Sequence, residues 1–308
     1  MTNMTEYAAS FMANGKGMLV LDDYAAASVT APPWPGLSFE RYSELIMRST
    51  RLSPYLSTVI VSRDTVLAGA ARPHKIGLGV RMTLPAGRAP GDLRGRLATM
   101  ASHGVTLAEW RANLPLAKIP RGGVHTDAAT LAEGAAASLA EGITPLLTVA
   151  MPDLESHSQG VTHAATANAL TAVSAALASA GIDPAAVLLR VNMIVPGSTN
   201  PTQPDPIDVA QSTVAVLSES IDPALGGVVL LSGGQHIDQA CQNLRAIAQV
   251  AHDRSSPWPI TFGFTRATVM ASLDVPEAKD EQAVHGALVD ACERAFESAS
   301  GSATCAAP

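Results

Sequence analysis

Short apolar segments alternate along the chain with longer segments of helical character. Continuous apolar runs of five to eight residues, bounded by Gly, Pro or Ser, are typical of strands buried on both faces of a parallel sheet. Eight such runs are present: Gly17–Asp22, Ser57–Arg63, Lys75–Met82, Leu107–Leu114, Thr144–Met151, Ala186–Met193, Gly227–Gly234 and Pro259–Arg266.

Helices are predicted in five of the intervening or terminal segments. They are Thr126–Glu141, Val161–Gly181, Asp208–Ser218, Ile237–Ala251 and Pro276–Ser298, the first two with glycine stop signals. Regular alternation of strands and helices, without a second compositional block, predicts an α/β protein with a single (β/α)₈ TIM barrel. The alternative is an open doubly wound sheet, which the absence of a glycine-rich dinucleotide fingerprint after the first run disfavours.

The domain prediction is one barrel over residues 1–300 and a flexible C-terminal tail over residues 301–308, where the chain is small and polar. Two proline-containing loops follow the first and sixth runs, Ala31–Gly36 and Ser198–Pro206. Loops after strands form the active face of a barrel. Each of these loops therefore either borders a ligand site or is an ordinary surface connection.

Composition and charge narrow the function classes. The chain has 308 residues, of which 47% are hydrophobic, and a net charge of −7, so no basic footprint for nucleic acid is expected. Cys241, Cys292 and Cys305 follow no metal or disulfide spacing, which suits a reducing compartment. With neither a signal peptide nor an apolar run of about 20 residues, we expect a cytoplasmic protein without a membrane partner.

Charged residues inside the predicted strands are informative because a buried charge is costly unless it is paired or used. Asp22 ends the first run, Glu109 and Arg111 share one face of the fourth, and Arg190 and Asn192 share one face of the sixth. All of them are expected at one barrel mouth. A purely structural salt-bridge network of Asp22, Glu109 and Arg190 is the alternative.

An anion site is predicted where the seventh and eighth runs end. The Ser232-Gly233-Gly234 turn precedes a predicted helix, so its N–H groups and the helix dipole favour an anion such as phosphate. Arg266 would add a bidentate contact. The eight histidines form no metal-ligand pattern, and we predict no metal and no cofactor.

Five segments, in order and on the expected strands, resemble the motifs of the class I fructose-bisphosphate aldolases. The resemblance implies the same TIM barrel fold, and since that family commonly forms tetramers, a homo-oligomer is among the expected states. The segments are Gly15–Asp22 (GKGMLVLD, family GKGILAAD), Leu107–Arg111 (LAEWR, family FAKWR), Leu188–Gly197 (LLRVNMIVPG, family LLKPNMVTPG), Leu231–Gln235 (LSGGQ in both) and Thr261–Arg266 (TFGFTR, family TFSYGR).

The departures from these motifs concern the family's imine chemistry. The resemblance implies that Arg190 stands where the family has its imine-forming lysine, and a protonated guanidinium is a poor nucleophile. Glu109 stands at the strand-four lysine, and Thr148 and Ala150 at the strand-five glutamates. A strand-three lysine near Gly77 and the C-terminal tyrosine are absent.

The matching positions are those expected to bind the ligand. Arg111, Asn192, Ser232, Gly233, Thr265 and Arg266 are the predicted substrate- or phosphate-binding residues, and Asp22, Glu109 and Arg190 the predicted catalytic ones. The first hypothesis is an aldolase-like carbon–carbon lyase for a phosphorylated or anionic carbonyl compound. Arg190 would polarise the carbonyl or stabilise an enolate, and Glu109 or Asp22 would move the proton.

Two alternatives remain open. One is a pseudoenzyme that binds sugar phosphates without turnover and has a regulatory or scaffolding role. The other is fructose-bisphosphate cleavage with a relocated lysine. Lys16, Lys75 and Lys279 are poorly placed in the predicted barrel, which leaves Lys118, just beyond the fourth run, as the candidate.

Overall fold

The computed structural model describes residues 3–21, 25–27, 37–69, 73–83, 90–113, 123–151, 156–275 and 280–300. Asp22, the loop Ala31–Gly36, Lys118 and the predicted tail 301–308 lie outside these ranges.

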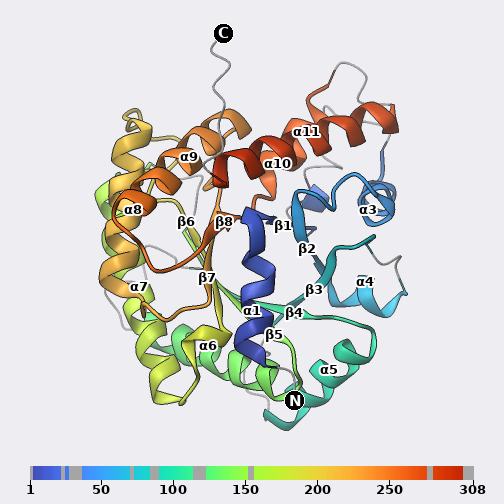
Figure 1. Cartoon of the computed structure of the whole chain (residues 1–308), viewed down its shortest axis with the longest axis horizontal. Helices are drawn as coiled ribbons and strands as arrows, with labels where there is room; N and C mark the ends of the chain where they lie inside the picture. Colours follow the sequence, from blue (N-terminus) through green and yellow to red (C-terminus); the bar gives the residue numbers. More distant parts are fainter. Residues whose placement is uncertain are drawn as a thin grey trace.

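Eight parallel strands form one sheet in sequential order, which confirms the predicted (β/α)₈ barrel (Figure 1). The Thr261 hydroxyl donates to the carbonyls of Gly15 and Lys16, at 2.8 and 3.0 Å, and so joins the last strand to the segment before the first. An open doubly wound sheet has a different strand order, so that alternative is wrong. The strands are β1 (Gly17–Val20), β2 (Leu56–Ser62), β3 (Gly77–Met82), β4 (Leu107–Asn113), β5 (Thr144–Ala150), β6 (Leu188–Asn192), β7 (Gly227–Leu231) and β8 (Ile260–Phe262).

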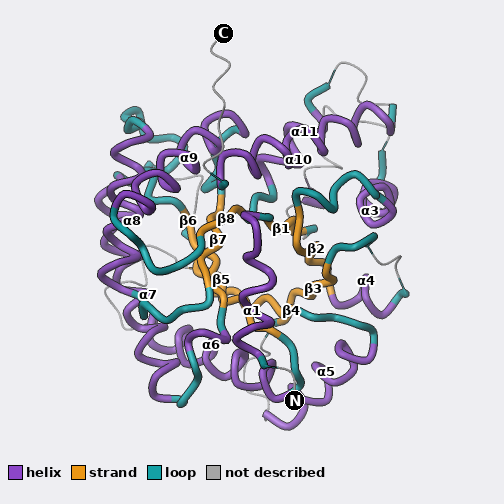
Figure 2. Tube along the Cα trace, viewed as in Figure 1, coloured by secondary structure: helices purple, strands orange, loops and turns teal. Residues whose placement is uncertain are grey.

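Helices surround the sheet, as Figure 2 shows, and none in the described ranges is long and apolar enough to cross a membrane. The five predicted helices are present with shifted ends. The last begins at Glu281, after the Asp280 side chain that caps it, rather than at Pro276. The predicted helices are α6 (Gly123–Ala140), α7 (Gln159–Ser179), α8 (Pro206–Ser220), α9 (Ile237–Asp253) and α11 (Glu281–Ala299). Five further helices were not predicted: α1 (Met4–Met12), α3 (Phe39–Arg48), α4 (Arg63–Leu67), α5 (Pro90–Ser102) and α10 (Arg266–Leu273).

The N-terminal helix α1 closes one end of the barrel and lies across its centre in Figure 1. Phe11 and Met12 pack into an interior cluster with Met18, Leu146 and Leu188. A side chain on Gly227, the first residue of β7, would lie 2.7 Å from Met12. Because α1 covers the amino ends of the strands, a ligand site belongs at their carboxyl ends.

Trp110 shows how the side chains of β4 are oriented. Trp110 is buried against α6, where its Nε1 donates to Ser138 Oγ at 2.9 Å. Neighbouring residues of a strand point to opposite faces, so Glu109 and Arg111 face the barrel interior, as predicted.

Replacing Gly134 with alanine is expected to destabilise the fold by about 1–3 kcal/mol, the usual cost of overpacking. The new Cβ would lie 2.5 Å from the Trp110 ring. Gly286→Ala is the matched control, because nothing lies within 4 Å of its Cβ and alanine suits a helix better by about 0.5–1 kcal/mol. Urea unfolding measures both, and equal effects would contradict the tight contact at Trp110.

Candidate active site in the barrel interior

A fully buried carboxylate, Glu109 of β4, lies at the centre of the polar residues inside the barrel. Its Oε1 accepts hydrogen bonds from Thr148 Oγ1 and Arg190 Nη1, both at 2.8 Å. Its Oε2 accepts from Nε and Nη2 of Arg81, at 2.9 and 2.8 Å. The parallel register makes this possible, because Arg81 pairs with Glu109 and Thr148 pairs with Arg190 on adjoining strands.

The Arg190 guanidinium crosses from β6 to the end of β8. Its side chain is 1% exposed, and its Nη2 donates to the Gly263 carbonyl and to Thr265 Oγ1, the latter at 3.1 Å. A Cβ on Gly263 would lie 2.9 Å from Arg190 Nε and 2.6 Å from Val229 Cγ1. Glycine at this position therefore makes room for the guanidinium.

The charge state of Glu109 is fixed by its neighbours. Burial by itself raises the pKa of this carboxyl, but the guanidinium groups of Arg81, Arg190 and Arg111 and the Thr148 hydroxyl together lower it to about 2. Glu109 is therefore ionised throughout the physiological range and is a weak base, since a general base works best with a pKa near the operating pH.

Arg81 is the functional candidate that the sequence reading missed. It lies on β3 with a side chain 22% exposed, between the buried Glu109 and the solvent. The signal was present, because Arg81 is a charged residue inside a predicted strand, the criterion that identified Glu109 and Arg190. The lysine that the resemblance implies on this strand is expected near Gly77, four residues earlier.

Arg111 and Asn192 lie one step nearer the carboxyl end than Glu109 and Arg190. Arg111 is exposed, and its charge contributes to the low pKa of Glu109. Asn192 is buried and accepts a hydrogen bond from the Met151 N–H at 2.9 Å, which ties the end of β6 to the end of β5. The predicted loop Ser198–Pro206 follows, and α8 begins at its last residue.

The Ser232-Gly233-Gly234 turn connects β7 to α9. Gly233 and Gly234 have φ values of +58° and +84°, which favour glycine. Within the described ranges, no residue accepts a hydrogen bond from the Gly233 or Gly234 N–H. A Cβ on Gly233 would lie 3.3 Å from Asn192 Nδ2, so the turn and the end of β6 adjoin.

The end of β8 leads into the short helix α10. Thr265 is its N-cap residue, but the hydroxyl is engaged with Arg190 and makes no capping bond. Arg266, half-buried, is the first residue of the helix. Thr265 was predicted to bind ligand, and the structure gives it a contact with Arg190.

The predicted site residues thus gather at the carboxyl ends of the strands, except for Asp22, which lies outside the described residues. Among the described residues, the carboxyl ends of the strands bring the arginines Arg81, Arg111, Arg190 and Arg266 together with the carboxylate of Glu109. Guanidinium groups are chemically suited to bind anions. In the described part of the chain, no group of three or more His, Cys, Asp or Glu side chains is arranged to hold a metal ion.

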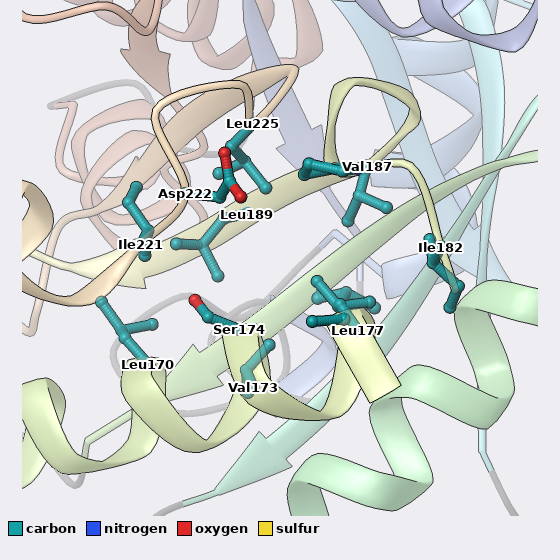
Figure 3. A pocket seen from close by; sticks show the side chains of 13 residues that line it. Leu170, Val173, Ser174, Leu177, Ile182, Val187, Leu189, Ile221, Asp222 and Leu225 are labelled. Atoms are coloured by element: carbon teal, nitrogen blue, oxygen red, sulfur yellow. The ribbon is translucent and has the colours of Figure 1, made fainter. Parts of the chain in front are cut away.

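An apolar cavity of about 50 Å³ lies elsewhere, between α7 and the outer faces of β5 and β6 (Figure 3). Leu147 and Leu189 line it, and they alternate with Thr148 and Arg190 along their strands. The cavity is therefore on the opposite side of the sheet from the Glu109 network and is no part of the candidate site.

Comparisons with known proteins agree with the fold. A family model described as fructose-bisphosphate aldolase class-I matches residues 87–305. A probable fructose-bisphosphate aldolase class 1 of Xylella fastidiosa is 27% identical over 299 residues, 88% of each chain. Fructose-bisphosphate aldolase C of Rattus norvegicus is 31% identical over 180 residues, 58% of this chain and 49% of its own. The solved fructose-bisphosphate aldolase of Plasmodium falciparum, in complex with TRAP and an inhibitor, has a TM-score of 0.83 at 24% identity, covering 97% of this chain and 94% of its own.

Glu109→Gln is expected to destabilise the protein by about 3–5 kcal/mol at pH 7, because it leaves the buried Arg190 without its counter-ion. The folded pKa of Glu109, about 2, is below the ordinary value of 4.5. Its stabilisation is therefore complete above about pH 4.5 and is lost as the pH falls toward 2. Urea unfolding should show that the difference in free energy of unfolding between wild type and variant is smaller at pH 3 than at pH 7.

Glu281→Gln is the control for this experiment. Glu281 pairs with Arg41 at the surface, where an ion pair contributes about 0–1 kcal/mol. A Glu109→Gln cost no larger than that of Glu281→Gln would contradict the buried network.

Proposed function

The chain belongs to the class I fructose-bisphosphate aldolase family, and from that premise we propose that it is an aldolase-like enzyme that works without a lysine imine. Its substrate is a phosphorylated or otherwise anionic carbonyl compound, and its reaction is carbon–carbon bond cleavage or formation, or related enolate chemistry. The observation that carries this proposal is the buried Glu109–Arg190 pair, at the position where the resemblance expects the imine-forming lysine.

The described lysines do not supply a substitute nucleophile. Lys16 Nζ donates to the Ser53 carbonyl at 2.7 Å, near the amino ends of the strands. Lys75 precedes β3, also at the amino end. Lys118 and Lys279 lie outside the described residues, so Lys118 remains the candidate for the relocated-lysine alternative.

The anionic group of the substrate is assigned to the turn after β7 and the start of α10. Ser232, the Gly233 N–H and Arg266 are its proposed ligands, and loops after strands seven and eight with a short extra helix recur as phosphate sites in this fold. Helix N-termini favour anions through their unpaired N–H groups and dipole.

The proposed chemistry stabilises an enolate by charge. In the cleavage direction a base removes the proton of the hydroxyl group on the carbon β to the carbonyl. The Cα–Cβ bond then breaks: the alkoxide oxygen becomes the carbonyl oxygen of one product, and the electron pair of the bond forms the C=C bond of an enolate, with the negative charge on the original carbonyl oxygen. Protonation of the enolate at Cα gives the second product. Arg190, which is buried, and the more exposed Arg81 and Arg111 would supply positive charge for that oxygen, and the charge of the buried group acts most strongly because little water surrounds it.

Proton transfer is assigned to Asp22 rather than to Glu109. Glu109 already accepts four hydrogen bonds and has a pKa of about 2, so it is unsuited to collect a proton near neutral pH. Its proposed role is to hold Arg81 and Arg190 in place.

A second candidate function is sugar-phosphate binding without turnover. The saturation of Glu109 and the 1% exposure of Arg190 favour it, because both residues already have structural partners. Exchange of substrate α-protons with solvent deuterium separates the two candidates, since only an enzyme that forms an enolate catalyses it.

Borohydride reduction with fructose 1,6-bisphosphate or triose phosphates is expected to leave the intact mass unchanged, while the same compounds raise the Tm. The reason is that Arg190 forms no imine. A ligand-sized mass gain, mapped to Lys118 by peptide analysis, would instead support the relocated lysine. Compounds that neither add mass nor raise the Tm would count against a sugar-phosphate site of any kind.

Arg266→Met is expected to weaken binding of triose phosphates about 10- to 100-fold, which corresponds to a lost charged hydrogen bond of about 1.5–3 kcal/mol. Arg254→Met is the control, because this substitution removes the same charge from an exposed residue at the C-terminal end of α9. Isothermal titration calorimetry measures both. If the two variants weaken binding equally, the effect comes from net charge and not from a site at α10.

A further inference from the structure

The Ser232 carbonyl is held by two donors from one residue. The Gln235 N–H donates to it at 3.1 Å, and the Gln235 side-chain Nε2 donates to it at 2.6 Å. The same Nε2 lies 3.6 Å from Met193 Sδ. The carbonyl therefore has a fixed direction within the turn.

The direction of a carbonyl determines the direction of the next N–H. In a trans peptide the C=O and N–H bonds lie in one plane and point to opposite sides. With the Ser232 carbonyl turned toward Gln235, the Gly233 N–H points away from Gln235. None of the described residues accepts a hydrogen bond from that N–H, so it is available to a ligand.

The orientation of the Gln235 amide is set in turn by helix α9. Asn243 is 2% exposed, and its Nδ2 donates to Gln235 Oε1. Because Oε1 is taken by Asn243, Nε2 faces the Ser232 carbonyl. On its other side, Asn243 Oδ1 accepts from Gln239 Nε2 at 3.2 Å.

We infer that Asn243 and Gln235 are positioning residues for the anion site: Asn243 orients the Gln235 amide, which fixes the Ser232 carbonyl and so aims the Gly233 N–H at the bound anion. Neither residue is itself a ligand of the anion. This inference rests on the proposed anion site after β7. It adds Asn243, a buried residue of α9 that lies eight residues after Gln235 in the chain, to the determinants of anion affinity.

Asn243→Asp tests the inference with almost no change in shape. A carboxylate cannot donate to Gln235 Oε1. The Gln235 amide should therefore rotate so that Nε2 donates to Asp, and Oε1 then faces the Ser232 carbonyl, with which it cannot bond. We expect about tenfold weaker binding of inorganic phosphate by calorimetry on the full chain.

Two further variants separate orientation from charge and from general damage. Gln235→Met removes both amide groups without adding charge, and it should weaken phosphate binding to a similar extent. Gln239→Met removes the neighbour on the other side of Asn243 but leaves the donor to Gln235, so it should change phosphate affinity by less than about twofold.

Hydrogen exchange of the Gln235 backbone amide gives a readout without ligand, because this N–H also donates to the Ser232 carbonyl. Exchange should be faster in Asn243→Asp and Gln235→Met than in wild type, and unchanged in Gln239→Met. If wild type binds neither phosphate nor sugar phosphates, the proposed anion site is wrong. If wild type binds phosphate but both test variants bind it equally well, or their Gln235 amide exchanges as in wild type, the positioning role is wrong.

Discussion

The ion pair between Glu109 and Arg190, both buried inside the barrel, imposes conditions on every residue around it. An ionised group removed from water is costly unless its hydrogen-bonding capacity is satisfied, and in a protein interior the loss of one partner leaves the other uncompensated. Glu109 meets this condition with donors from β3, β5 and β6, and Arg190 meets it at the end of β8. Glu109, Arg81, Thr148, Arg190 and Thr265 therefore form one hydrogen-bonded network rather than a set of independent residues.

Five departures from the family pattern, at Glu109, Thr148, Arg190, Gly263 and Thr265, lie in this network or in contact with it. In the family motif TFSYGR, serine stands at the position of Gly263 and glycine at the position of Thr265. Here Gly263 leaves space for Arg190, and Thr265 accepts a hydrogen bond from it. Thr148, at a family glutamate, donates to Glu109. A second carboxylate at position 148 would place a negative charge against Glu109, so these substitutions are consistent with one another physically.

The fold was predictable because its strands are buried on both faces. Such strands are continuous apolar runs, as in β5, where every residue is buried, and all eight were found. The missed helices α1, α4 and α10 are nine residues or fewer, too short for a clear periodicity. For the site, strand alternation predicted that Glu109 and Arg190 would meet. The four bonds to Glu109 were not predictable, because they depend on the register between strands. Arg81 was not predicted because its pairing with Glu109 also depends on that register, and Asn243 because a lone polar residue in a helix gives no signal.

The candidate site has two parts: the buried network of Glu109, Arg81, Arg190 and Thr148, and the Ser232-Gly233-Gly234 turn with the start of α10. We assign them different roles. At about 4 Å, opposite unit charges attract by about 4 kcal/mol at an effective dielectric constant of 20, so an anion that drew Arg190 away from Glu109 would give up much of what it gained. In the proposed anion site, binding energy would then come mainly from groups outside the Glu109–Arg190 pair, such as the Gly233 N–H. The hydrogen bonds among Glu109, Arg81, Arg190 and Thr148 hold the charges of this network in fixed positions. Preorganised charge of this kind needs no rearrangement as negative charge develops on a carbonyl oxygen, which is the condition for electrostatic catalysis.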